Sequence, residues 1–294
     1  MSWIHGFELM CYGIVAVMLI DLIRKKDYDS LFTFGSAAIV GFVMELLAVA
    51  VTDIYYYNPE FYLNLGTVPK QFPVFGGFMW GGLTVYGIRL ANKLKWKPFP
   101  TALAAGMFIV TMDILLDVVA IRLDGGFWVW VGKEISLGID QHTFMSVIWV
   151  NFLGYMIETP TVVLLTLRKR KLVVPTDFKK QFKHMVLIAL GAIGVTAVGS
   201  LIALGLNAVT DDWFACIAFC LVWTVMAVWM VCRCIKLRLK PGKPDVPALV
   251  FWAAMYGYCL AALVSLGIHT QAPWFWVVGI AFAVGTLYIT AADE

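Results

Sequence analysis

The sequence contains few charged residues for its length. Only 14% of its 294 residues are Asp, Glu, Lys or Arg, and 61% are hydrophobic, whereas about a quarter of a soluble domain is charged. Apolar runs of about twenty residues recur along the chain, and the alternating segments of an outer-membrane barrel are missing. The composition therefore predicts an all-α fold, a polytopic integral membrane helical bundle.

Other sequence features that are missing exclude several classes of function. The first 26 residues lack the positive start and small-residue cleavage site of a signal peptide. The basic residues lie in short loops and form no groove-sized patch, so we predict no nucleic-acid partner. No CxxC pair occurs among the six cysteines, which we interpret as small packing residues.

Nine apolar segments are long enough to cross about 30 Å of hydrocarbon. They are approximately residues 3–23, 31–53, 72–92, 101–122, 142–167, 185–207, 213–235, 248–268 and 273–291. Basic residues crowd alternate connections, at 24–26, 93–97, 168–183 and 236–243. The positive-inside rule places these four connections in the cytoplasm. We therefore expect about nine transmembrane helices in the cytoplasmic (inner) membrane, with the N-terminus outside and the C-terminus cytoplasmic.

The chain divides into two halves that differ in polarity. Residues 1–167 form a five-helix membrane half with buried ionisable residues, and residues 185–294 form a four-helix apolar half. Residues 168–184 form a basic cytoplasmic loop between them, which we expect to touch anionic membrane lipids. The helices of residues 185–291 are candidates for contacts with protein partners.

Several carboxylates lie inside the expected spans, where a charge costs at least about 2.5–3.5 kcal/mol. Counting 1.5 Å per residue places Glu45, Asp113 and Asn151 about 12–13 Å below the outer ends of three spans. Asp117 lies one turn from Asp113 on the same helix face. Two neighbouring carboxyl groups cannot both ionise cheaply, so one should hold a proton, as general acid–base chemistry requires. Interhelical hydrogen bonding that merely holds the bundle together is the alternative.

Two further groups of polar residues lie in or near the expected spans. A mixed His/carboxylate metal site is less favoured, because no HxxxH or ExxH pair is present, and we predict no metal. Its ligands would come from His5, Glu8, Glu45, Asp113 and His142. Glu158 precedes Pro160, which should kink its helix, so we expect Glu158 to satisfy the backbone groups that the kink frees.

The connections expected outside are rich in aromatic residues. One contributes Tyr55 and Tyr57 and leads to Trp80, and another, "GGFWVWVG", contributes Trp128 and Trp130. An interfacial aromatic belt would account for these rings. They could instead wall the mouth of a site for an apolar, polyene-like or cationic ligand, because aromatic faces attract positive charge.

An ordered set of motifs runs across residues 34–165. It comprises Glu45, the segment Tyr55 to Tyr57, Val68-Pro69, "DILLDVVA" from Asp113 followed by "GFWVW", and "NFLGY" from Asn151. This set resembles the carotenoid biosynthesis membrane protein family, which includes the bisanhydrobacterioruberin hydratases. The chain departs from the family pattern where Val118 replaces a proline and "LGIDQHTF" replaces a glycine-proline turn.

The resemblance implies a hydratase-like enzyme (a hydro-lyase) that needs no cofactor and acts on an isoprenoid or carotenoid-like lipid. In such a reaction a carboxylic acid protonates a terminal C=C, a tertiary carbocation forms and water adds. Asp113 or Glu45 would be the proton donor, and Asp117 would orient water or act as base. The residues expected to bind the substrate are Asn151, Tyr55, Tyr57, Trp128, Trp130 and Trp80.

Two other functions stay open from the sequence. A non-catalytic membrane subunit of a larger complex, binding lipid or pigment, would fit the twelve tryptophans and the apolar second half. A proton-coupled transporter would use Glu45, Asp113 and Asp117. It would also need polar groups across the whole bilayer, and Glu158 alone lies on the expected cytoplasmic side.

Overall fold

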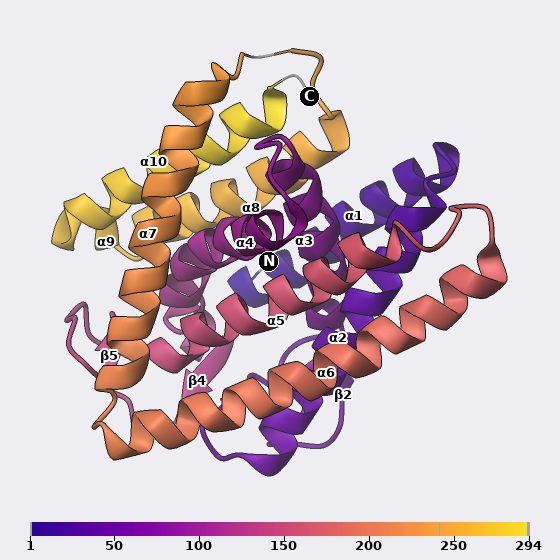
Figure 1. The fold of residues 1–294 in the computed structure, drawn as a ribbon. Helices are drawn as coiled ribbons and strands as arrows, with labels where there is room; N and C mark the ends of the chain where they lie inside the picture. Colours follow the sequence, from indigo (N-terminus) through magenta and orange to yellow (C-terminus); the bar gives the residue numbers. More distant parts are fainter. Residues whose placement is uncertain (1, 241, 293–294) are drawn as a thin grey trace.

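Long helices make up most of the protein (Figure 1). This computed structural model describes residues 2–240 and 242–292. The helices that cover the expected spans are α1 (Trp3–Arg24), α2 (Tyr28–Val51), α3 (Val74–Asn92), α4 (Pro98–Ala120), α5 (Trp149–Lys169), α6 (Phe178–Val209), α7 (Trp213–Leu237), α8 (Val246–Ser265) and α10 (Pro273–Ala291). A single turn, α9 (Ile268–Gln271), precedes α10, and the short 3-10 helix η1 (Leu123–Gly125) follows α4. The expected all-α helical bundle is confirmed.

The length and the apolar composition of the helices indicate a membrane bundle. Within the described ranges, eight helices are long and apolar enough to cross a membrane. The glycine-rich helix α3 is long enough but is not among them. The number of spans therefore stays a prediction, as does the side of the membrane on which each terminus lies.

The four basic connections meet at one end of the bundle, which we call the basic end (residues 25–27, 93–97, 170–177, 238–240 and 242–245). Arg89 of α3 forms ion pairs with Asp27 (3.0 Å) and with Asp245 (2.7 Å). At the same end, Asp29 forms ion pairs with Lys169 (2.7 Å) and with Arg170 (2.5 Å). These bonds tie three sequence-distant connections together, as their alternation along the chain predicted.

Three short antiparallel strand pairs lie at the opposite end, which we call the strand end. They are β1 (Tyr55–Tyr57) with β4 (Trp128–Trp130), β2 (Asn64–Leu65) with β3 (Phe72–Pro73), and β5 (Thr143–Phe144) with β6 (Val147–Ile148). Glu8 of α1 is fully buried beneath them and accepts the backbone N–H groups of Tyr62 (2.6 Å) and Leu63 (3.1 Å). A carboxylate in the first helix thus anchors the long connection between α2 and α3.

The prediction of a span that begins near residue 142 is wrong by about two turns. Residues 143–148 form the β5–β6 hairpin, and α5 begins only at Trp149. Asp140 accepts the backbone N–H groups of His142 and Thr143, both at 2.8 Å, which holds the chain in a turn. These same bonds lower the pKa of Asp140 below its usual value.

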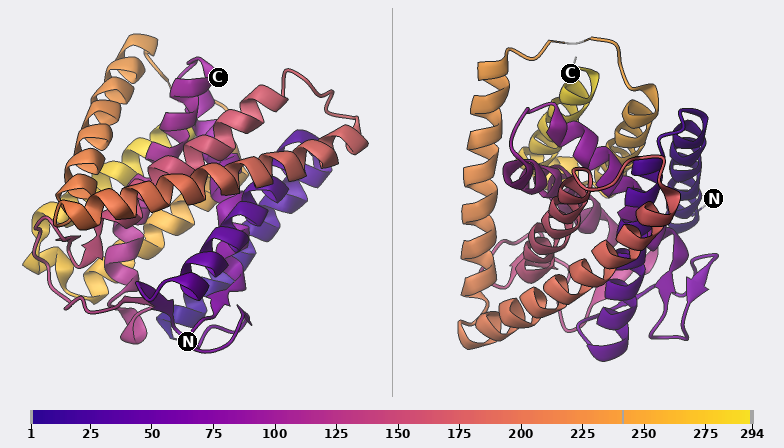
Figure 2. Two further views of the ribbon diagram at one scale, coloured as in Figure 1. Left: turned by 60° about the horizontal axis from the view of Figure 1, so that its bottom comes forward. Right: turned by 45° about the vertical axis from the view of Figure 1, so that its right-hand side comes forward.

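Helix α4 lies at the centre of the bundle. It packs against α3, α5, α7, α8 and α10, and 89% of its most apolar stretch is buried. In contrast, α6 and α7 have only 22% of theirs buried. Figure 2 shows α6 running along the side of α2 and α5, and α7 standing at the edge of the molecule. Polar residues of α4 are therefore enclosed by protein on all sides.

Candidate functional site

Glu45 of α2 receives hydrogen bonds from two different elements. Its Oε2 atom accepts the hydroxyl groups of Tyr55 (2.6 Å) and Tyr57 (2.8 Å), both on β1. Burial, followed by the charge of Glu45, raises the pKa of both tyrosines well above the usual value, so both stay protonated and donate. Trp80 Nε1 of α3 donates to Oε1 at 3.4 Å. Three hydrogen-bond donors therefore converge on one carboxyl group.

Asp113 and Asp117 of α4 are almost completely buried, with exposed fractions of 3% and 2%. Tyr155 donates to Asp113 Oδ1 (3.0 Å), and Asn151 donates to Asp117 Oδ2 (2.5 Å). The two donors lie one turn apart on α5, as the two aspartates do on α4. Two hydrogen bonds therefore connect these antiparallel helices. The sequence placed Asn151 at the depth of Asp113, but the structure places it against Asp117.

The two aspartates also interact with each other. Their carboxyl groups are in direct contact, and the Trp128 side chain contributes a hydrogen bond to Asp117. Asp113 Oδ2 is buried and receives no donor from any described residue. One proton shared between the two carboxyl groups would satisfy this oxygen and remove the repulsion between two buried negative charges.

Trp80 connects the glutamate to the aspartates. Its indole ring stacks on the Tyr155 ring at a centroid distance of 4.9 Å, while its Nε1 reaches Glu45. The ring fits because residue 41 of α2 is glycine, since a Cβ atom there would lie 2.4 Å from the Trp80 ring. Close packing of α2 on α3 therefore fixes the position of Trp80 between the two groups of carboxylates.

The β1–β4 ladder covers the carboxylates with aromatic rings. Its register pairs Tyr55 with Trp130 and Tyr57 with Trp128. The corresponding ring centroids lie 5.1 Å and 6.0 Å apart. Two connections that are far apart in the sequence thus build one aromatic wall.

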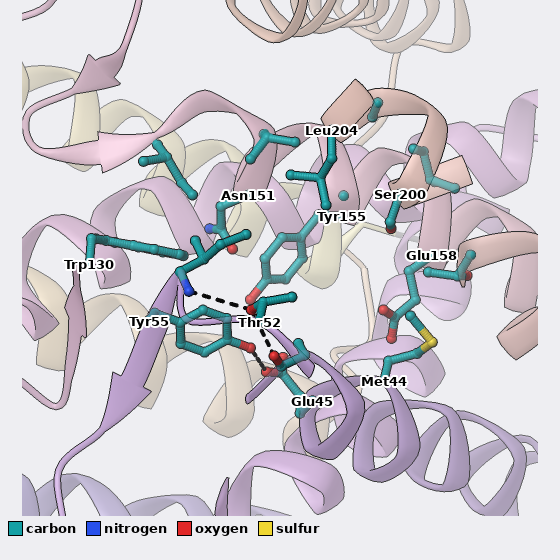
Figure 3. Close-up of a pocket in the computed structure, with 18 of the residues that line it drawn as sticks. Met44, Glu45, Thr52, Tyr55, Trp130, Asn151, Tyr155, Glu158, Ser200 and Leu204 are labelled. Atoms are coloured by element: carbon teal, nitrogen blue, oxygen red, sulfur yellow. Dashed lines mark hydrogen bonds between the residues drawn. The ribbon is translucent and has the colours of Figure 1, made fainter. Parts of the chain in front are cut away.

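Two cavities adjoin these groups. The first, of about 170 Å³, lies between α2, α5 and α6, and Figure 3 shows Tyr55 pointing its hydroxyl at Glu45 in its wall. The second, of about 70 Å³, is lined by Asp113, Tyr57 and Trp128. Glu45, Trp80 and Tyr155 line both cavities and separate them. Every predicted site residue lines one cavity or both, except Asp117, which lies behind Asp113.

Two residues of this site, Tyr155 and Glu158, were not assigned to it from the sequence. Tyr155 is four residues after Asn151, and this helical spacing is a signal that would have pointed to it. Glu158 was expected to satisfy backbone groups near Pro160, and this expectation is wrong. Its Oε1 atom is buried without a hydrogen-bond partner and faces the first cavity, as does Thr196 Oγ1 of α6.

The alternative metal ligands are not brought together. His142 Nδ1 lies 2.8 Å from Asp212, at the start of α7, and His5 Nε2 lies 2.9 Å from the carbonyl oxygen of Glu60. Over residues 2–240 and 242–292, no three His, Cys, Asp or Glu side chains converge on one point that would hold a metal ion.

Comparisons with models of protein families, with curated proteins and with solved structures return no match to this chain. The resemblance of residues 34–165 to the carotenoid biosynthesis membrane protein family rests on the sequence motifs alone.

Proposed function

We propose that the protein is an integral membrane enzyme that adds water to a C=C bond of an isoprenoid or carotenoid-like lipid. The observation that carries this proposal is the buried pair of Asp113 and Asp117, next to a cavity walled by aromatic rings. The motifs that resemble the carotenoid biosynthesis family support it. The positive-inside rule would put the strand end, and with it the site, toward the outer side of the cytoplasmic membrane.

In the proposed reaction, the carboxyl pair gives its proton to one carbon of the double bond. The π electrons form the new C–H bond and leave a tertiary carbocation on the neighbouring carbon. A water molecule then bonds to that carbon and loses a proton, which returns to the carboxylate. Water is the only co-reactant, so the step balances without an oxidant, a reductant or a cofactor.

The hydrogen bonds assign different roles to the carboxylates. Glu45 accepts hydrogen bonds from three donors, which fix its carboxyl group in place, and a negative charge there would stabilise the carbocation. Asp113 lines the second cavity and would deliver the proton. Asp117 is held by Asn151 and would receive the proton back from water.

The cavities have the size and lining that this chemistry needs. A cavity of about 150 Å³ holds one benzene molecule, so the first cavity, of about 170 Å³, accommodates about one isoprene unit of the lipid chain. The reacting C=C bond would lie in the second cavity, of about 70 Å³, next to Asp113. The rings of Trp80 and Tyr155 would face a positive charge there, and such a contact is worth about 2 kcal/mol or more when desolvated. Apolar walls would also limit the number of water molecules that reach the carbocation.

The proposal is tested by lipid analysis of cells that accumulate acyclic polyenes. Cells that express the wild type should contain polyenes that are heavier by one water molecule. The Asp113→Asn variant should lower this product by about 100-fold or more, the range expected for loss of a general acid. Asp53→Asn, an exposed aspartate at the same end, is the matched control and should keep the product. Identical lipids with and without the protein would refute the proposal.

A second candidate is a non-catalytic membrane subunit that binds a lipid or a pigment. Two apolar cavities favour it, of about 240 and 340 Å³, along α7. Trp223 and Phe282 line both, and no Asp, Glu, Lys or Arg lines either of them. A pigment that co-purifies equally with the wild type and Asp113→Asn, without any change in cellular polyenes, would favour this candidate.

A further inference from the structure

The first cavity has an aromatic lining from four elements. The stacked rings of Trp80 and Tyr155 form one side, and Tyr55 with Trp130, at a centroid distance of 5.1 Å, forms another. The faces of such rings carry partial negative charge and attract cations. No Lys, Arg or His side chain lines this cavity.

Two carboxyl groups line the same cavity from different helices, Glu45 on α2 and Glu158 on α5. Figure 3 shows Glu158 next to Ser200 of α6, away from the aromatic wall at Trp130. In the part of the chain that the structure describes, neither glutamate takes part in an ion pair. Glu45 has hydrogen-bond donors but no positive charge beside it.

The side of the cavity away from Trp130 carries polar atoms that lack hydrogen-bond partners. Glu158 is 8% exposed and Thr196 is 2% exposed, and Glu158 Oε1 and Thr196 Oγ1 both lack a hydrogen-bond partner. Buried polar atoms without partners cost about 1–3 kcal/mol each, so a water molecule, an ion or a ligand is expected to pair with them. A cation would place positive charge against these two oxygen atoms, which a purely hydrocarbon ligand at this side of the cavity would not.

We propose that this cavity binds an apolar molecule that carries one positive charge, of the class of the alkylammonium ions. A carboxylate of the cavity wall would supply the opposite charge, and the aromatic rings would supply cation–π contacts. The volume of about 170 Å³ fits a group the size of trimethylammonium. The inference goes beyond the proposed hydration, because it concerns a stable ligand and rests on Glu158 and Thr196, which that reaction does not use.

The experiment measures equilibrium binding to the purified full chain in a nonionic alkyl maltoside detergent, which contributes no charge. The probe is a tritiated alkyltrimethylammonium ion, and the competitor is its isostere with carbon in place of nitrogen. We expect saturable binding, with the isostere weaker by about ten-fold or more. Equal competition by the uncharged isostere would overturn the inference. This comparison uses the unmodified protein, so it does not depend on whether any variant folds.

Single-residue variants then show which carboxyl group binds the positive charge of the probe. Glu158→Gln should weaken binding of the ammonium probe by about ten-fold or more, whereas the exposed Glu134→Gln should stay within two-fold of the wild type. Equal loss in both variants, or no loss in Glu158→Gln, would contradict the assignment. Short-chain phosphatidylcholine should compete poorly, because its phosphate would face two carboxyl groups. Strong competition would instead identify a lipid headgroup as the ammonium source.

The outcome is separable from that of the proposed function. Binding of the probe without any hydrated lipid in cells would support this inference and refute the hydratase proposal. Hydrated lipid without charge-selective binding would do the reverse.

Discussion

Helices α4 and α7 are both apolar and of similar length, 23 and 25 residues, but they have opposite surroundings. In α4, 89% of the most apolar stretch is buried inside the protein, and in α7 only 22% is. The buried helix carries Asp113 and Asp117 in its sequence interior, whereas the charged residues of α7, Arg233 and Lys236, lie in its last five residues, at the basic end. Hydropathy alone does not separate a helix that faces lipid from one enclosed by other helices.

The polar residues make the distinction that hydropathy does not. A carboxyl group exposed to lipid would lack any donor, whereas one inside the bundle can be satisfied by neighbouring helices. Asp113 and Asp117 receive donors from α5, and Glu45 receives donors from β1 and α3. An ionisable residue in an apolar run therefore indicates a protein-facing side as well as a candidate site.

The largest expected effect comes from truncating equivalent leucines on the two helices. Leu115 of α4 is fully buried, so Leu115→Ala should destabilise the protein by about 2–5 kcal/mol. Leu221 of α7 is 62% exposed, and Leu221→Ala should change stability by about 0.5 kcal/mol or less. Thermal unfolding in detergent measures both. Similar losses for the two variants would show that α7 is covered by a partner.

A smaller effect on stability is expected from adding a methyl group to a glycine in each half, because the two halves differ in how closely their helices pack. Gly41→Ala should cost about 1–3 kcal/mol, because the new Cβ would lie 2.4 Å from the Trp80 ring. Gly205 of α6 has no atom within 4 Å of that position, so Gly205→Ala should be neutral or stabilising by up to about 1 kcal/mol. Thermal unfolding and the near-ultraviolet signal of tryptophan report both. A neutral Gly41→Ala would mean that α2 and α3 are less closely packed.

Within the site, two adjacent tyrosines should differ. Tyr57 donates to Glu45 at 2.8 Å, whereas Tyr56 is 40% exposed and points away. Tyr57→Phe should cost about 1.5–3 kcal/mol, the value of a hydrogen bond to a charged group, while Tyr56→Phe should have almost no effect. Chemical denaturation of both variants checks this. Equal stabilities would show that the hydrogen bond from Tyr57 to Glu45 does not stabilise the fold.

The smallest expected effect concerns the start of α6. Asp177 caps this helix by accepting the backbone N–H of Lys180, which lowers the pKa of its carboxyl group. Its stabilising contribution is therefore present above the unfolded pKa and is lost as the pH falls through the lowered folded pKa. Asp177→Ala should lower the melting temperature slightly at pH 7, and the difference should shrink below about pH 4. A difference that persists at low pH would exclude the charged cap as its cause.

The sequence predicted the helices well because each span is a long apolar run with its own ends. It also indicated that Glu45, Asp113 and Asp117 belong together, because residue counting along a helix gives depth. The count failed for Asn151, because residues 143–148 were taken as helix and form a hairpin. Asn151 therefore lies about one turn nearer the strand end than predicted, against Asp117.

Contacts between distant segments were beyond sequence reasoning. The β1–β4 pairing joins residues about seventy positions apart, and strands of three residues have no recognisable pattern of their own. The unpaired state of Glu158 depends on how α6 crosses α5, which no local pattern determines. Pro160 suggested a local partner for Glu158, but tertiary packing left it facing a cavity.

The central claim is that the buried aspartate pair protonates a double bond inside the membrane. It is tested most directly by incubating the purified protein with an acyclic polyene in deuterated water enriched in oxygen-18. We predict a product with one deuterium bound to carbon and one oxygen-18 in a hydroxyl group, formed by the wild type and lost in Asp113→Asn. A product that forms equally in that variant, or none with the wild type, would contradict the account.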